Sequence, residues 1–239
     1  MLTPGQNGTP QTLLIDADDT LWENNIYFER AIADFISFLN HREFTPKQVR
    51  ERLNDVERQS IKTHGYGIHS FAGALCKTFE CLSVESLTEE LREKIHSFAL
   101  RIAENPVEII AGVPETLQHL ASREHHLILM TKGNPAEQMS KIERSGLKDY
   151  FSAVEVVAEK NASAYHAVAE KYGLDSDVTW MIGNSPRSDV NPALEAGLHA
   201  VFVPHDMTWV LEHEEIGSPS RAGQKLLKIE RFSELQKHF

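Results

Sequence analysis

The order of apolar runs after Pro106 constrains the fold more than any other feature of this sequence. Four times in this part of the chain a helix-like stretch leads to a short apolar run typical of a strand: "HLILM", "FSAVEVV", "VTWMIG" and "HAVFVP". An earlier apolar run, "QTLLI" at residues 11–15, adds a fifth candidate strand. Strands that alternate with helices favour a parallel sheet covered by helices on both faces. The predicted fold class is therefore α/β, with a doubly wound parallel sheet.

The pattern changes between Asn24 and Asn105, where apolar residues recur three and four positions apart. This spacing is typical of amphipathic helices, and we expect about four of them with no strand. A chain of 239 residues suits a core with a second, smaller domain. We therefore expect a discontinuous core formed by residues 11–22 and 108–239, an inserted all-helical domain at 23–107, and a flexible tail at 1–10.

Composition narrows the classes of partner. The formal net charge of −11 argues against nucleic acid or an anionic membrane as the main partner. No apolar run approaches the 18 residues of a membrane-spanning helix, and the first ten residues lack the features of a signal peptide. The two cysteines, Cys76 and Cys81, form no CxxC pattern and indicate reduced thiols in a cytoplasmic protein. A small molecule is the expected partner, and the oligomeric state stays open.

The first strand ends in an unusual density of negative charge. In "LLIDADDTLW", Asp16, Asp18 and Asp19 fall within four positions, and a bound cation would remove their mutual repulsion. Ligands of open parallel sheets gather at the carboxyl ends of the strands, so residues that follow the other strands are expected at the same place. They offer a hydroxyl, two lysines, two amides and a carboxylate: Thr131, Lys132, Asn134, Lys160, Asn184 and Asp189.

Four of these stretches together resemble the motifs of the haloacid dehalogenase (HAD) superfamily, whose members are mostly phosphatases. "IDADDTL" is similar to the first motif, "LILMT" to the second, Lys160 to the third and "WMIGNSPRSDV" to the fourth. The helical insert is similar to the family's C1-type cap. The resemblance covers nearly the whole chain and implies a Rossmann-like core with the strand order 3-2-1-4-5.

The resemblance also implies an activity, namely Mg²⁺-dependent hydrolysis of a small phosphorylated metabolite through an aspartyl-phosphate intermediate. Asp16 would be the nucleophile, because a carboxylate needs no base to ionise it at neutral pH. Asp18 would protonate the leaving oxygen and later accept a proton from water. The remaining roles are the phosphoryl contacts Thr131 and Lys160, the Mg²⁺ ligands Asp16, Asp18 (through its backbone carbonyl), Asn184 and Asp189, and the substrate-binding residues Ala17, Asp19, Lys132 and Asn134.

One departure from the family pattern matters. The fourth motif usually reads G-D, but here it is Gly183-Asn184, which removes one negative charge and predicts a lower metal affinity. Two alternatives therefore stay open: a metal-independent dehalogenase in which Asp16 attacks carbon, and a phosphate-binding protein of the same fold with little turnover. The second acid, Asp18, favours the phosphatase. In the insert, His64, Tyr66 and His69 surround two glycines, so they are candidates either for substrate contact or for ordinary helix capping.

Overall fold

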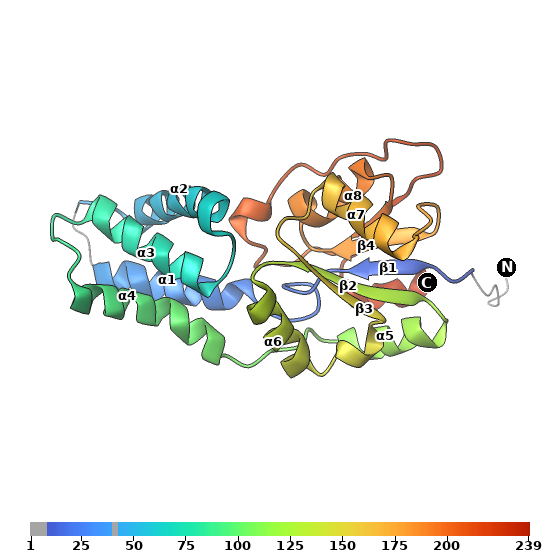
Figure 1. Cartoon of the computed structure of the whole chain (residues 1–239), viewed down its shortest axis with the longest axis horizontal. Helices are drawn as coiled ribbons and strands as arrows, with labels where there is room; N and C mark the ends of the chain where they lie inside the picture. Colours follow the sequence, from blue (N-terminus) through green and yellow to red (C-terminus); the bar gives the residue numbers. More distant parts are fainter. Residues whose placement is uncertain (1–8, 40–42) are drawn as a thin grey trace.

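The chain folds into a sheet-containing core and a neighbouring bundle of helices, which we call the cap (Figure 1). The structure is a computed structural model that describes residues 9–39 and 43–239. Residues 1–8 of the predicted tail lie outside the described residues. Among the described helices, none is both long enough and apolar enough to cross a membrane.

A single sheet of six parallel strands forms the centre of the core. Its order is β3-β2-β1-β4-β5-β6, so the predicted α/β fold and the order 3-2-1-4-5 are confirmed. The sixth strand was not expected, because its three residues form no distinct apolar run. The strands are β1 (Thr12–Ile15), β2 (His126–Lys132), β3 (Ala153–Val157), β4 (Thr179–Gly183), β5 (His199–Phe202) and β6 (Leu226–Lys228).

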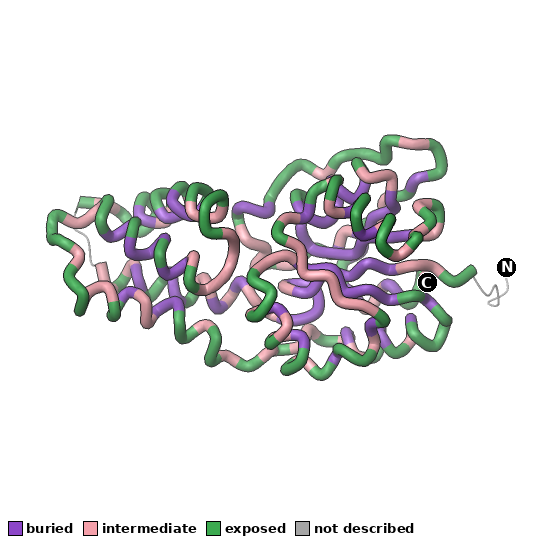
Figure 2. Tube along the Cα trace, in the orientation of Figure 1, coloured by how far each residue is buried: buried purple, intermediate pink, exposed green. Residues whose placement is uncertain are grey.

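Helices cover both faces of the sheet, and successive strand residues point to opposite faces. Leu13 and Ile15 pack against one layer, whereas Leu14 packs against the other. The first layer contains α5 (Val113–Ser122), α6 (Pro135–Ser145) and the C-terminal turn η5 (Phe232–Lys237); the second contains α7 (Ala162–Tyr172) and α8 (Asn191–Glu195). Figure 2 shows mostly buried central strands between more exposed helices, while the edge strands β3 and β6 are less buried.

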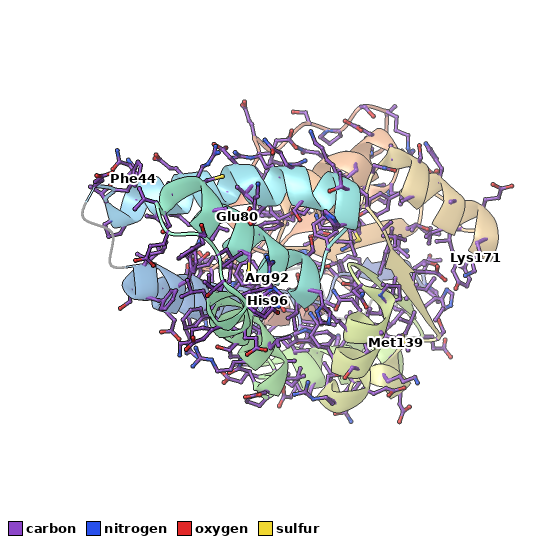
Figure 3. All side chains as sticks on the ribbon, turned by 60° about the vertical axis from the view of Figure 1, so that its left-hand side comes forward. Phe44, Glu80, Arg92, His96, Met139 and Lys171 are labelled. Atoms are coloured by element: carbon purple, nitrogen blue, oxygen red, sulfur yellow. The ribbon has the colours of Figure 1, made fainter. Side chains whose placement is uncertain are left out.

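The cap has its own hydrophobic core, formed by residues such as Phe35, Leu53, Leu75 and Ile95. Its helices are α1 (Asn25–Leu39), α2 (Pro46–His64), α3 (Ile68–Leu82) and α4 (Glu89–Leu100), followed by the turn η1 (Arg101–Glu104). Figure 3 shows polar side chains on α3 and α4, with Glu80 and Arg92 among them. The ion pairs there are exposed, for example Lys77–Glu80 at 3.1 Å, and such pairs contribute little to stability.

The two connections between cap and core run side by side. Trp22 and Ile109 form an antiparallel bridge, and the Glu23 amide donates to the Glu108 carbonyl at 2.9 Å. We call this paired connection the hinge; it follows the loop after β1 that carries Asp16 and Asp18.

Candidate active site

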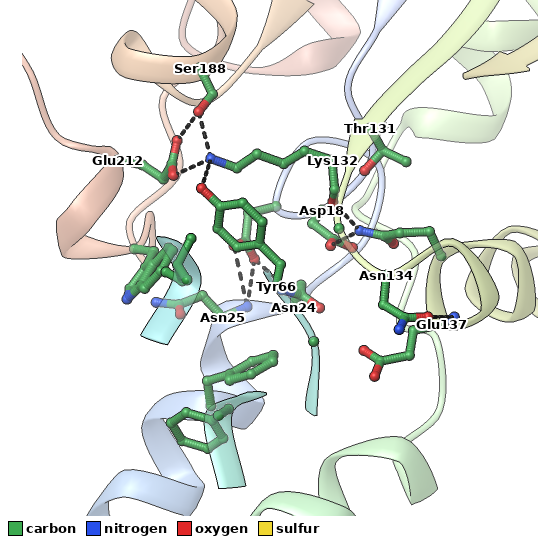
Figure 4. A pocket seen from close by; sticks show the side chains of 18 of the residues that line it. Asp18, Asn24, Asn25, Tyr66, Thr131, Lys132, Asn134, Glu137, Ser188 and Glu212 are labelled. Atoms are coloured by element: carbon green, nitrogen blue, oxygen red, sulfur yellow. Dashed lines mark hydrogen bonds and ion pairs between the residues drawn. The ribbon is translucent and has the colours of Figure 1, made fainter. Parts of the chain in front are cut away.

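A cavity of about 1110 Å³, which includes the part open to solvent, lies between the cap and the carboxyl ends of the strands (Figure 4). Its charged lining is strongly acidic, with seven carboxyl side chains against three lysines. The acids are Asp16, Asp18, Asp19, Glu57, Glu137, Asp189 and Glu212, and the lysines are Lys132, Lys141 and Lys160. A phosphate dianion would be repelled from such a cavity unless a cation accompanied it.

Asp16 follows β1 and meets Lys160 at the centre of the core side. The Lys160 Nζ donates to Asp16 Oδ1 at 2.5 Å and to Asp189 Oδ1 at 2.7 Å. Burial alone would lower the pKa of Lys160, but the Asp16 and Asp189 charges raise that pKa, so the amine stays protonated. Burial raises the pKa of Asp189 above its ordinary value in spite of the Lys160 charge, with a further contribution from Asp16. When Asp16 and Asp189 are both ionised, one ammonium leaves a net negative charge between them, and burial disfavours that charge.

Asn184 brings an amide oxygen to the same place. Thr20 Oγ1 donates to Asp16 Oδ2 at 2.9 Å and lies 3.3 Å from Asn184 Oδ1. Gly183 leaves room for Asp189, since a Cβ on this glycine would lie 2.2 Å from Asp189 Oδ2. The structure thus brings together three of the predicted metal ligands, and their donors are all oxygens, which suits a hard divalent cation.

A different group of potential ligand atoms lies at the hinge. Among the described residues, three His, Cys, Asp or Glu side chains come within 4.8 Å of one another only at Asp19, Glu23 and His205. This group already has structural partners: Asp19 accepts from the amides of Asn24 and Asn25 at the start of α1, and His205 Nε2 is 3.2 Å from Glu23. The predicted metal site differs from this group, because its side-chain oxygens come from the carboxylates of Asp16 and Asp189 and the amide of Asn184.

The Asp18 carboxylate is turned toward α6. It accepts from Lys141 Nζ at 2.6 Å, from Gln138 Nε2 at 2.9 Å and from Trp22 Nε1 at 2.7 Å. Burial works to raise the pKa of Asp18, but the Lys141 charge and these hydrogen bonds hold it below its ordinary value. Asp18 is therefore ionised in this arrangement, and its side chain is occupied by protein donors.

Three of the residues expected to bind substrate, Ala17, Asp19 and Asn134, lie at strand ends where their backbone amides could hold a phosphoryl oxygen. The Asp19 amide donates to the Trp22 carbonyl at 2.8 Å, so it cannot also bind a phosphoryl oxygen in this conformation. The cause is a tight turn in which Asp19 takes a positive φ of 59°. The amides of Ala17 and Asn134 donate to no acceptor among the described residues and stay available. Asn134 uses its side chain to cap α6, accepting from the Ala136 amide at 3.0 Å.

The two residues at the end of β2 differ in surroundings. Thr131 is buried at the cavity wall, at the position expected for a phosphoryl contact. Lys132 is held by core and cap together: its Nζ donates to Glu212 at 2.5 Å, to Ser188 at 2.7 Å and to Tyr66 at 3.3 Å (Figure 4). Burial would lower the pKa of Lys132, but Glu212 in the turn η4 (Val210–Glu212) raises it.

The cap loop between α2 and α3 contacts the core through Tyr66. The Tyr66 hydroxyl donates to Glu159 at 2.7 Å, and the Ile68 amide donates to Glu137 at 3.0 Å. Tyr66 lines the cavity, whereas His64 and His69 are exposed and lie outside its lining. Of the three cap candidates named from the sequence, only Tyr66 faces the site.

Several residues at the site were not identified from the sequence. Thr20 does not line the cavity but donates to Asp16, and its place in the first motif, "IDADDTL", was a signal for this contact. Glu57 falls on the buried stripe of α2 with Val49, Leu53 and Val56, so a charge on an apolar helix face was also a signal. No sequence pattern indicated Lys141 or Glu212 as site residues, because only the tertiary fold brings them to the site.

Comparison with known proteins gives the family and related folds. The family model of haloacid dehalogenase-like hydrolases matches residues 10–197. A curated relative, pyrimidine 5'-nucleotidase PynA of Streptococcus pneumoniae, is 26% identical over 107 residues, which cover 42% of this chain and 45% of that protein. The alignment thus spans less than half the length of the curated relative.

Among solved structures, a haloacid dehalogenase-like hydrolase from Xanthomonas campestris has a TM-score of 0.79 and 28% identity, over 96% of this chain and 94% of its own. The HAD hydrolase YfnB from Bacillus subtilis, bound to magnesium, has a TM-score of 0.69 and 18% identity over 96% and 98%. The 2-haloacid dehalogenase from Pseudomonas syringae has a TM-score of 0.59 and 19% identity over 96% and 97%. With its sheet order, its cap and the family match over most of its length, this chain belongs to the haloacid dehalogenase-like hydrolases.

Proposed function

We propose that this hydrolase is a Mg²⁺-dependent phosphatase that acts on a small phosphorylated metabolite. The observation that carries the proposal is the placement of Asp16 at the carboxyl end of β1, ion-paired to Lys160 and beside the oxygens of Asn184 and Asp189. A nucleophile, a cationic phosphoryl contact and a set of oxygen ligands are the three parts that phosphoryl transfer requires.

The reaction divides between two carboxyl groups. Asp16 attacks phosphorus, so an oxygen–phosphorus bond forms while the bond to the leaving oxygen breaks, and the leaving oxygen takes a proton from Asp18. Water then attacks the phosphorus of the aspartyl-phosphate, Asp18 takes the water proton, and Asp16 is released. Lys160, Thr131 and the amides of Ala17 and Asn134 are placed to hold the phosphoryl oxygens.

The Asp18 carboxylate must break its ion pair with Lys141 before it can take part in these proton transfers. Because Lys141 lowers the pKa of Asp18, the carboxyl in the described arrangement is a base and not an acid. A bound phosphate dianion repels a neighbouring carboxylate and so favours its protonated form. Substrate binding and protonation of Asp18 are therefore coupled.

The residues that would hold Mg²⁺ are Asp16, Asn184 and Asp189 through their side chains and Asp18 through its backbone carbonyl. When bound, the ion would supply the positive charge that lets a carboxylate approach a phosphate. The excess of carboxylates over lysines in the cavity supports this assignment.

A cavity partly covered by a cap favours a small substrate over a phosphoprotein, and the acidic charge of the chain disfavours nucleic acid. The similarity to a pyrimidine 5'-nucleotidase supports a nucleoside monophosphate among the candidate metabolites. The free thiols of Cys76 and Cys81 support a reducing, cytoplasmic location.

Metal-independent dehalogenation is the second candidate. Asn184 favours it, because the site has one carboxylate fewer than a usual metal site of this family, and dehalogenases are among the chains with a similar fold. In that reaction Asp16 would attack carbon and displace halide, with no need of Asp18 as an acid.

Hydrolysis of 4-nitrophenyl phosphate with and without Mg²⁺ tests the proposal. We expect turnover that EDTA abolishes and that the Asp16→Asn variant lacks, while the exposed control Asp149→Asn keeps it. Release of halide from 2-chloropropionate in EDTA would instead establish the dehalogenase. Binding of inorganic phosphate without turnover of any ester would support the phosphate-binding alternative.

A further inference from the structure

One polar atom in the cap part of the cavity has no partner. Glu57 of α2 lines the cavity and is only 7% exposed, and its Oε2 is buried without a hydrogen bond from any described residue. A buried carboxyl oxygen without a donor costs free energy that a matching donor on a ligand would recover.

The charged neighbours of Glu57 are engaged elsewhere. Arg50 forms a two-pronged ion pair with Glu29, at 2.7 and 2.6 Å, and Arg58 pairs with Asp55 at 2.6 Å. These neighbours change the charge around Glu57 but give its Oε2 no hydrogen bond. Burial raises the pKa of Glu57 to about 7, with opposing contributions from Arg50 and Glu29. Near neutral pH the group is thus partly a neutral acid, with an O–H donor beside a C=O acceptor.

The cap side of the cavity is mostly apolar and partly aromatic, apart from Ser60 and Ser70, whose hydroxyls are hydrogen-bonded to each other at 3.1 Å. Phe28 of α1 and Phe71 of α3 meet with their ring centres 5.1 Å apart, and Ile32, Ile61 and Ala74 also line this end of the cavity. Such a wall suits a flat ring, because aromatic faces and edges pack well against one another. The acidic reaction centre lies at the core side of the same cavity.

We propose that Glu57 hydrogen-bonds the leaving group of the substrate, and that this group ends in a flat ring with an amide N–H on its edge. The inference rests on the proposed phosphatase function, because it takes the phosphate to lie at Asp16. A carboxyl group and a cyclic amide edge match as donor–acceptor pairs. The chemical class is a phosphate monoester with a pyrimidine-like base.

Two nucleotides that differ only at the ring edge provide the test. Uridine 5'-monophosphate carries an N–H at N3, whereas N3-methyluridine 5'-monophosphate does not, and their ester bonds are the same. We expect the native protein to prefer the first by about tenfold or more in kcat/KM, which matches the loss of one buried hydrogen bond. Glu57→Gln keeps an acceptor and a donor and should keep this preference, whereas Glu57→Met should lose most of it.

Glu51→Gln, on the exposed face of the same helix, is the matched control and should leave the preference unchanged. Equal kcat/KM for the two nucleotides, or a preference that survives in Glu57→Met, would overturn the proposal. So would a preference for phosphoethanolamine that Glu57→Met removes, because Glu57 would then bind a cation and not a ring. Circular dichroism melting confirms that each variant is folded.

A failure of the proposed phosphatase function can be distinguished from a failure of the role of Glu57. In the first case the protein hydrolyses neither 4-nitrophenyl phosphate nor either nucleotide. The role of Glu57 is then measured with uridine and N3-methyluridine, which need no reaction, by saturation-transfer NMR. Binding of uridine to the native protein and to Glu57→Gln but not to Glu57→Met supports the inference, and equal binding of both nucleosides refutes it.

Discussion

Glu57 is a carboxyl group that the fold buries without a cation, and its stability effect depends on pH. Its pKa is about 7 in the folded protein, against an ordinary value of 4.5. Between these values the unfolded chain loses the proton while the folded chain keeps it, so stability falls as pH rises from about 4.5 to 7 and stays lower above.

Glu57→Gln should remove this loss, because glutamine does not ionise. We expect the variant to gain stability relative to the native protein as pH rises from 5 to 8, by about 2.5 kcal/mol from the difference between the folded and unfolded pKa values of Glu57. Urea unfolding at the two pH values measures it. Glu51→Gln is the exposed control, and a gain that is the same at both pH values would contradict the prediction.

Asn184 is a ligand of the proposed metal site and carries no charge. Asn184→Asp adds a carboxylate beside Asp16 and Asp189 and should lower the Mg²⁺ concentration for half-saturation by about threefold to tenfold. The magnesium-dependent rise in melting temperature reports this without activity. Asn54→Asp on the cap is the control, since it keeps the acceptor for Arg50. An unchanged magnesium titration in Asn184→Asp would show that Asn184 is not a ligand.

At the scale of elements, the loop between α2 and α3 must approach the core closely. Gly67 has a φ of 125°, and a Cβ there would lie 2.9 Å from Glu137 Oε1 and 3.2 Å from Asn134 Cβ. Gly67→Ala should hold the cap away from α6 and lower kcat/KM by about tenfold or more, because a displaced cap no longer closes the cavity.

Gly65→Ala is the matched control for this change. Gly65 also has a positive φ, of 73°, but its Cβ would meet nothing within 4 Å. Both variants carry backbone strain, and only Gly67→Ala also meets the core. Steady-state kinetics with small-angle scattering measure the difference, and equal effects of the two variants would mean that strain alone is responsible.

The sequence predicts a structural feature best when a single stretch of the chain forms that feature. The apolar run before Asp16 predicts β1, and the motif "IDADDTL" predicts the loop after it. Lys132 shows the limit: its place beside the cavity at the end of β2 was predicted, whereas its ion pair with Glu212, 80 positions away, was not. The stretch from Glu212 to β6 has no periodic pattern of apolar residues. For this reason neither the Lys132–Glu212 ion pair nor β6 could be predicted from the sequence.

For the whole molecule, net charge affects the approach of substrate. With a net charge of −11, the protein repels an anion at long range. Raising salt from about 10 to 150 mM shortens the screening length from about 30 to 8 Å. At saturating Mg²⁺ we therefore expect kcat/KM for an anionic ester to rise about twofold, with kcat nearly constant. A fall with salt would mean that the local field of the lysines and the metal dominates.

The two hinge segments lie side by side where the chain leaves the core and where it returns. Because Glu23 and Glu108 are joined by a backbone hydrogen bond of 2.9 Å, the 84 residues between them leave and re-enter the core at one point. A short turn could close this gap, and another helical insert could be grafted there without rearranging the sheet. The proposed selection of substrate by Glu57 thus belongs to the insert and the proposed chemistry of Asp16 belongs to the core, so that one part can be exchanged while the other stays intact.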